Sequence, residues 1–468
     1  MGGNSLKGVI LMGFTHSIAR WILNTGYHDF SEDVKLSAKR CILDTIGVAL
    51  AGSRAEASNI IMEYALHESA VGKSLIWGSG IRTSPGLAAL TNGTMAHALD
   101  FDETNYSSIA HPSAVILPAV LAAAEVLNCT GEEFLSSFIV GYEVTSKLGR
   151  AVNPKAYEKG WWTTSALGTI GATTAVGHLW GLNQQQTEWA LGLAIGQASG
   201  VRANNGTLAK PFQAGRAAQN GVLSAQLAQR GLTASPAAFE KTAGFFDVCV
   251  DGHYIDVTEV LGHPFDLVEP GVSFKQYPSC SASHAAVDAL LGMISEHDLS
   301  WKDIASVICE VTPLVNMSLV YDSPAMPDEA RFSMPFCIAA ALKERQLPPS
   351  CFTQDYLKDS AVRGLMKKVT MTVAPNVSNG GQSFPLEGPE AARVIIETKG
   401  RQIFSKTVQH AKGGTENPLS WDELVNKFQH CVEPFFAGQE IDQIKEAVFG
   451  IESLTHVIEL VRLLEIKR

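Results

Sequence analysis

The feature that most constrains the fold of this chain is an almost unbroken succession of helical patterns from residue 14 to about residue 265. Alanine and leucine dominate these segments, and the alternation of β-branched residues that is typical of strands is nearly absent. The patterns predict a bundle of helices for this half of the chain. We expect helices at 14–23, 34–50, 84–102, 113–127, 131–152, 164–180, 184–200 and 211–229.

The hydrophobic pattern of the sequence changes after about Pro270, where apolar and polar residues alternate within short segments, as is typical of half-buried strands. The last residues return to a helical pattern that opens with a capping box at Ser420. We therefore expect a mainly α protein with a large all-helical domain built from both chain ends, 1–267 and 411–468, and a smaller α+β lid domain, 268–410, with a cleft between them. The expected strands are 306–313, 367–375, 392–400 and 401–409, with helices near 285–296 and 329–342.

Composition excludes several classes of function. The net charge is −11 and no stripe of lysine or arginine occurs, which argues against a nucleic-acid partner. The eight cysteines are scattered without a CxxC pair, so we expect free thiols, and the absence of an HExxH motif predicts no metal site. The most apolar expected helix, 113–127, is too short to span a membrane, and the apolar run at 9–14 is too short for a signal peptide. A cytoplasmic protein is expected.

Polar side chains are concentrated in the otherwise apolar segment 93–118, which holds three acids and two histidines. The pattern predicts a helix that ends near Thr104, a short loop, and a second helix with Pro112 in its first turn. Asp100 and Thr104 would then share one helix face, and His111 would lie at the entrance of the next helix. The alternative interpretation is a polar turn whose groups are solvated or cap the helices.

A lysine and a serine-rich segment form two further candidates. Lys210 directly precedes a proline at the start of an expected helix, where partial burial would lower its pKa and let it act as a base. Lys275 and His284 flank three serines that offer hydroxyl donors for a carboxylate, although helix capping explains the serines equally well. Cys280 between them is more simply a small buried thiol than a nucleophile. Three helix starts that converge would suit a small polyanionic substrate.

Eight short segments follow one another along the chain: ILDTIG at 42–47, NGTMAHALDFDET at 92–104, HPS at 111–113, GYEV at 141–144, AKPFQAGRAAQNG at 209–221, FKQYPSCSASHAAVDA at 274–289, EARFSMPF at 329–336 and NPLS at 417–420. In this order they resemble the MmgE/PrpD family, which includes 2-methylcitrate dehydratases, cis-aconitate decarboxylases and iminodisuccinate epimerases. The resemblance covers nearly the whole chain.

The resemblance implies a homodimer with an active site between the two domains and with neither metal nor organic cofactor. Matched motif by motif, it implies four catalytic residues and two residues of the lid that bind substrate. Two departures are present: Trp162 stands where the family pattern has a histidine, and the lid tyrosine of the family falls on Ser318, so that Tyr321 is the nearest candidate to replace it. The implied catalytic residues are Asp100, Thr104, His111 and Lys210, and the implied lid residues are Lys275 and His284.

The chemistry that the family shares is the stabilisation of a carbanion or enediolate beside a carboxylate while a proton moves. Lys210 and His111 would act as base and acid, and Thr104 would donate a hydrogen bond. Asp100 would orient His111 or stabilise its charged form. Lys275 would neutralise substrate carboxylates. We expect a lyase that acts on a small di- or tricarboxylate by decarboxylation or dehydration. An epimerase that uses the same two groups, and a catalytically silent binding or scaffold protein, are the alternatives.

Overall fold

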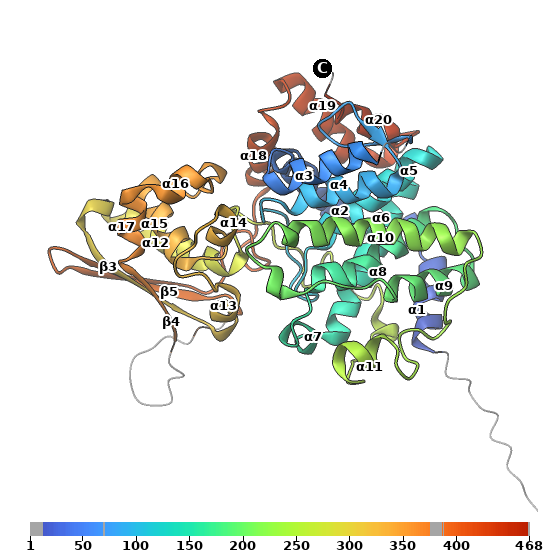
Figure 1. Cartoon of the computed structure of the whole chain (residues 1–468), viewed down its shortest axis with the longest axis horizontal. Coiled ribbons are helices and arrows are strands. Elements are labelled where there is room, and N and C mark those ends of the chain that lie inside the picture. The colour runs from blue at the N-terminus through green and yellow to red at the C-terminus, as the bar shows by residue number, and fades with distance from the viewer. Residues whose placement is uncertain (1–12, 69–70, 375–385, 387, 467–468) are drawn as a thin grey trace, which may run out of the picture.

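The computed structural model describes residues 13–68, 71–374, 386 and 388–466. Residues 9–12, which make up most of the apolar run considered for a signal peptide, lie outside the described part. Helices dominate, and strands are few and short, which confirms the predicted mainly α fold (Figure 1). No helix within the described residues is long and apolar enough to cross a membrane.

The helical body, on the right of Figure 1, is built around helix α5 (Pro112–Leu127), which is buried from Pro112 to Glu125. Helices α4 (Pro85–His97) and α8 (Thr163–Leu179) pack against α5, and α10 (Ala209–Gln229) crosses both. Alanine and glycine at the contacts let these helices approach closely. The other helices of this part are α1 (Phe14–Asn24), α2 (Glu32–Gly52), α3 (Glu56–His67), α6 (Gly131–Val152), α7 (Lys155–Glu158), α9 (Gln184–Ile195) and α11 (Phe245–Val250).

The smaller part, on the left of Figure 1, is a four-stranded sheet with helices packed on one face. The strand order is β4-β3-β5-β6; β3 pairs in parallel with β4 and antiparallel with β5, and Val307 lies opposite both Val369 and Ile396. The strands are β3 (Ile304–Val311), β4 (Val369–Val373), β5 (Ala392–Thr398) and β6 (Ile403–Val408), close to the four predicted segments. The helices are α12 (His284–His297), α13 (Pro313–Ser318), α14 (Pro327–Ala330), α15 (Met334–Glu344), α16 (Gln354–Lys358) and α17 (Ser360–Met366).

The C-terminal helices return to the helical body, where α18 packs against α2. Ser420 caps α18 by accepting the N–H of Glu423, as predicted. One hydrophobic cluster contains buried residues from Phe14 to Phe274 and again from Leu419 to Leu464, and a second runs from Ala282 to Ile396. The domain boundaries themselves stay a prediction. The returning helices are α18 (Trp421–Val432), α19 (Gly438–Phe449) and α20 (Ile458–Leu463).

Several expectations about local structure were wrong. A two-stranded hairpin, β1 (Ser74–Leu75) with β2 (Arg82–Thr83), lies in the part expected to be all helical, and α3 was not predicted. The helix expected at 329–342 is two helices, because Ser333 caps a new one by accepting the N–H of Phe336. The helix expected to reach Thr104 ends at His97, so Asp100 and Thr104 do not share a helix face.

The crossing of α4 and α10 depends on Gly215. A Cβ atom there would overlap the carbonyl oxygen of Leu90 and the Thr94 hydroxyl. We expect Gly215→Ala to lower the free energy of unfolding by about 1–3 kcal/mol, which thermal and urea denaturation would measure. Gly364→Ala is the matched control, because Gly364 also lies in a helix but has open space around it. Equal stability of the two variants would contradict the close approach of α4 and α10 at Gly215.

Candidate active site

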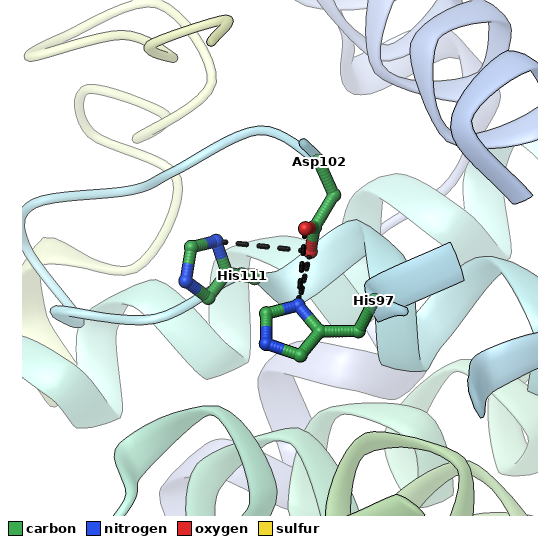
Figure 2. Close-up of side chains that lie close together, drawn as sticks. All are labelled: His97, Asp102 and His111. Carbon is green, nitrogen blue, oxygen red and sulfur yellow. Dashed lines mark hydrogen bonds and ion pairs between the residues drawn. The ribbon is translucent and has the colours of Figure 1, made fainter. Parts of the chain in front are cut away.

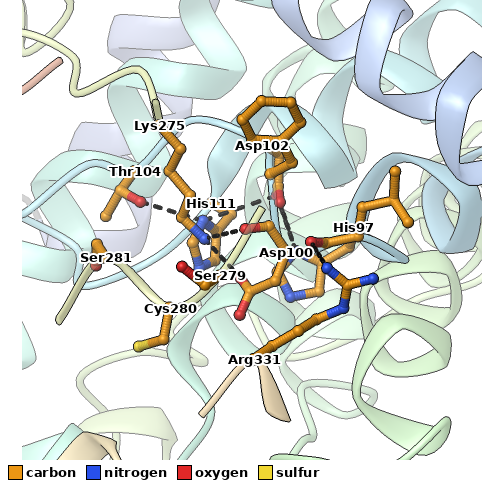
Figure 3. A network of polar contacts seen from close by, with 12 residues as sticks. His97, Asp100, Asp102, Thr104, His111, Lys275, Ser279, Cys280, Ser281 and Arg331 are labelled. Atoms are coloured by element: carbon orange, nitrogen blue, oxygen red, sulfur yellow. Dashed lines mark hydrogen bonds and ion pairs between the residues drawn. The ribbon is translucent and has the colours of Figure 1, made fainter. Parts of the chain in front are cut away.

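Charged and titratable side chains from both parts of the molecule line one cavity of about 300 Å³. Its walls come from the loop between α4 and α5 and the start of α10 on one side, and from residues within 275–390, here called the lid side, on the other. Figure 3 shows side chains of the loop beside Lys275 and Cys280 of the lid side. A larger cavity of about 840 Å³ lies elsewhere between the two parts, but it contains none of the predicted catalytic residues. The predicted residues that line the smaller cavity are Asp100, Thr104, His111, Trp162, Lys210 and Lys275.

The loop from Ala98 to His111 carries the acids of the site, and contacts with distant residues hold its shape. Asp100 adopts a left-handed backbone conformation, with φ of 50°, which aspartate tolerates better than most residues. The Arg331 guanidinium donates to the carbonyl of Leu99 at 2.8 Å, and Thr104 forms a β-bridge with Ser273. These contacts fasten the loop to the lid-side residues.

Asp100 is the centre of the charge network. Its Oδ1 accepts hydrogen bonds from Lys275 Nζ at 2.6 Å, and Lys210 Nζ lies 3.3 Å from the same atom. Its Oδ2 is buried without a hydrogen-bond partner among the described residues. Burial acts to raise the pKa of Asp100, but the two ammonium groups hold it well below its usual range. The prediction that Asp100 orients His111 is corrected, since Asp100 pairs with the lysines.

The two lysines of this network differ in their pKa. Burial lowers the pKa of Lys210, and the nearby charge of Lys275 lowers it further, against the effect of Asp100. For Lys275 burial acts in the same direction, but the carboxylates of Asp100 and Asp102 outweigh it and raise the pKa. Lys275 is therefore a fixed cation, whereas Lys210 can exchange a proton more readily.

Lys210 also ends a chain of hydrogen bonds that the sequence did not reveal. Its Nζ lies 2.6 Å from His97 Nε2, and His97 Nδ1 lies 2.8 Å from the Asp102 carboxylate (Figure 2). A carboxylate can only accept, so Nδ1 carries the hydrogen and Nε2 is free to accept from the Lys210 ammonium. His97 and Asp102 are both fully buried, and burial lowers the pKa of His97.

His111 presents a neutral imidazole to the cavity. Its Nδ1 lies 2.7 Å from the backbone carbonyl of Glu103 and 3.4 Å from the Thr104 hydroxyl. A carbonyl only accepts, so Nδ1 carries the hydrogen and Nε2 keeps its lone pair. Burial lowers the pKa of His111 to about 3, which keeps the ring neutral near pH 7. The carboxylate beside it is Asp102, with Oδ2 at 3.7 Å from Nδ1.

His97, Asp102 and His111 also form the only group among the described residues whose side chains are arranged as metal ligands could be, with the ligand atoms within 4.8 Å of one another. Both Nδ1 atoms, however, already bond to oxygen, and His97 Nε2 lies beside the Lys210 ammonium. A cation here would face that ammonium and would displace these hydrogen bonds. The donor set therefore fits a proton-transfer chain better than a metal ion.

Two sequence profiles cover most of the chain. Residues 16–258 match the MmgE/PrpD N-terminal domain, and residues 277–450 match the MmgE/PrpD C-terminal domain. The chain belongs to the MmgE/PrpD family. It is similar to the cis-aconitate decarboxylases of Homo sapiens, 26% identical over 98% of this chain and 95% of that protein, and of Aspergillus terreus, 26% identical over 97% of this chain and 96% of that protein. The Mus musculus cis-aconitate decarboxylase is also 26% identical, over 98% and 94% of the two chains.

The cavity of about 300 Å³ that Asp100, His111 and Lys210 line is here called the acid-base cavity. Two of the residues predicted to bind substrate in this MmgE/PrpD protein do not line it. His284 is buried and its Nε2 lies 3.3 Å from the carbonyl of Ser279; it lines an adjoining cavity of about 200 Å³ together with Lys275. Tyr321 donates its hydroxyl hydrogen to the carbonyl of Asn205. Ser318, three residues before it, does line the cavity.

Trp162, which also lines the acid-base cavity, packs against His97 and Lys210. Its ring lies 5.1 Å from the ring of His97, and Lys210 Nζ lies 5.4 Å from its centroid. An indole in this place excludes water and contributes a cation–π contact, but it holds no titratable proton. Acid-base chemistry therefore depends on the other lining groups.

At each of the three helix starts predicted to bind substrate, one N–H group is already bonded within the protein. The Ser113 N–H in α5 donates to Glu103 Oε1, the Lys210 N–H in α10 to the carbonyl of Thr207, and the Ser283 N–H before α12 to the carbonyl of Cys280. The ammonium groups of Lys210 and Lys275 line the cavity and are available to bind substrate carboxylates. Burial raises the pKa of Cys280 to about 12, so this thiol is not activated as a nucleophile.

Proposed function

We propose that the protein is a cofactor-independent lyase that acts on a small di- or tricarboxylate by decarboxylation or dehydration. The observation that carries the proposal is a single cavity lined by both a lysine ammonium with two acceptors and a neutral histidine with a free Nε2. Membership of the MmgE/PrpD family and likeness to cis-aconitate decarboxylases support the reaction type. We further propose that it works as a cytoplasmic homodimer.

The contacts of the two groups support roles that are the reverse of those expected from the sequence, where Lys210 was the base and His111 the acid. Lys210 is the acid, because its hydrogen-bond partner His97 Nε2 is an acceptor and its ion-pair partner Asp100 is an anion, and both favour the ammonium form. His111 is the base, because its Nε2 keeps a lone pair. In a dehydration, His111 takes the proton of a C–H bond, a C=C bond forms, and the hydroxyl leaves as water with a proton from Lys210. In a decarboxylation, the C–C bond to a carboxylate breaks, CO2 leaves, and the carbon takes the proton of Lys210.

The pH dependence follows from these roles. Because burial lowers the pKa of His111 to about 3, kcat/KM should show no acidic limb near pH 6.5. Because the pKa of Lys210 is lowered, the ammonium acid should be lost as the pH rises, on an alkaline limb below pH 10.5. The measurement is kcat/KM from pH 5 to 10, corrected for the ionisation of the substrate. An acidic limb near pH 6.5 would contradict the neutral His111.

The test of the reaction is incubation with cis-aconitate, citrate, 2-methylcitrate and iminodisuccinate in deuterated buffer, followed by proton NMR. Loss of CO2 or water from one of the first three is the expected result. Deuterium at a substrate carbon without loss of mass would instead identify an epimerase. No exchange on any of the four would refute the assignment as an enzyme of this class.

A further inference from the structure

Glu390 gives the lid wall of the cavity a negative charge that the mechanism above does not use. It lies just before β5 and lines the acid-base cavity together with Lys210 of α10 and His111, the residue before α5. Tyr106, from the loop between α4 and α5, donates its hydroxyl hydrogen to Oε2, and the Ser281 hydroxyl donates to Oε1 at 2.9 Å. The carboxylate is therefore fixed from both sides of the cavity.

Each oxygen of a carboxylate has room for more than one donor, so the two hydroxyls leave Glu390 able to accept a further hydrogen bond. Burial raises the pKa of this group, against the two hydroxyl donors and Lys275, so its charge is incompletely compensated by the protein. A donor from a bound molecule would stabilise the carboxylate, whereas a second carboxylate in the same place would be repelled.

The charges that line the cavity lead to the same conclusion. The cations Lys210 and Lys275 are matched by the anions Asp100 and Glu390, and Asp100 already accepts a hydrogen bond from Lys275 and forms an ion pair with Lys210. A polyanion that enters the cavity therefore meets no net excess of positive charge. A ligand binds most tightly if its carboxylates contact the two lysines and an O–H or N–H group donates a hydrogen bond to Glu390.

We propose that Glu390 selects substrates that carry a hydroxyl or N–H donor beside their carboxylates, in preference to those that are polycarboxylates alone. This inference rests on the proposed function and names its substrate class. It assigns Glu390 as a specificity-determining residue, with Tyr106 and Ser281 as the residues that position it.

Two ligands that differ only in a hydroxyl test the inference by their binding affinity and not by product formation. Citrate has the hydroxyl, and propane-1,2,3-tricarboxylate has the same carbon skeleton without it. We expect calorimetry to show that citrate binds the wild-type protein about tenfold or more tightly than the other. Glu390→Gln should bring the ratio toward one, chiefly by tightening the ligand that lacks the hydroxyl.

The matched control is Glu397→Gln, which changes an exposed glutamate on β5 and should leave both dissociation constants unchanged. Equal affinity of the wild-type protein for the two ligands would overturn the inference, and this result does not require a folded variant. An unchanged ratio in a folded Glu390→Gln protein would also overturn it. Because no turnover is measured, failure here is distinct from failure of the lyase assignment, which the NMR experiment decides.

Discussion

Replacing Lys210 with methionine should lower kcat by about 10²–10⁴-fold, the usual contribution of a positioned proton donor. Methionine keeps an unbranched apolar side chain between Trp162 and Phe332, against which the ammonium now lies. It removes the group that bridges His97 and Asp100. The measurement is the rate of product formation by NMR at saturating substrate, so that a change in binding does not obscure the change in chemistry.

Two further variants show whether the lower kcat results from the loss of the proton donor. Lys210→Arg keeps the charge but cannot exchange its proton near neutral pH, so we expect it to be nearly as inactive as the methionine variant. Lys302→Met changes a lysine that lies outside the cavity and should keep full activity. Comparable rates for wild-type protein and Lys210→Met, with both folded by circular dichroism, would remove Lys210 from the mechanism.

The sequence was sufficient to predict most helices and all four strands of the lid sheet, because their periodicity is local. It failed where distant residues decide the conformation. The helix expected to reach Thr104 stops at His97, and the freed carbonyls of Leu99 and Asp100 accept from Arg331 and Lys275. These partners are 232 and 175 residues further along the chain, beyond any local pattern.

The same error hid part of the candidate site. In a continuous helix, His97 and Asp102 would point to different sides, so no sequence pattern joined them. Once the helix ends at His97, the loop turns back and places the Asp102 carboxylate 2.8 Å from His97 Nδ1. The position of Lys210 in the first turn of a helix, by contrast, was predicted, because the proline that follows it marks the helix start.

Glu390 could not be predicted for a different reason. It lies outside any motif, and its partners Tyr106 and Ser281 come from segments that meet only when the lid-side residues pack beside the helical body. The signal that identifies it is the cavity itself. A site formed between two parts of a chain is visible in the sequence only where its residues fall in recognisable motifs.

Asp102→Asn should lower kcat by about 10²-fold or more, although Asp102 is not among the residues that line the cavity. The carboxylate fixes the hydrogen of His97 on Nδ1, so that Nε2 accepts from Lys210. An amide can donate to Nδ1 and so favour the tautomer with its hydrogen on Nε2, which would then face the Lys210 ammonium donor to donor. The measurement is kcat together with its pH profile.

The pH profile separates this positioning role from a loss of stability. The charge of Asp102 raises the pKa of Lys210, so its removal should move the alkaline limb of activity to lower pH. Asp44→Asn is the matched control: Asp44 is another buried carboxylate, 2.7 Å from Lys427 and outside the acid-base cavity. Its loss should lower the melting temperature but leave the limb in place. If Asp102→Asn also melts earlier yet keeps the wild-type limb, Asp102 supports the fold and does not tune Lys210.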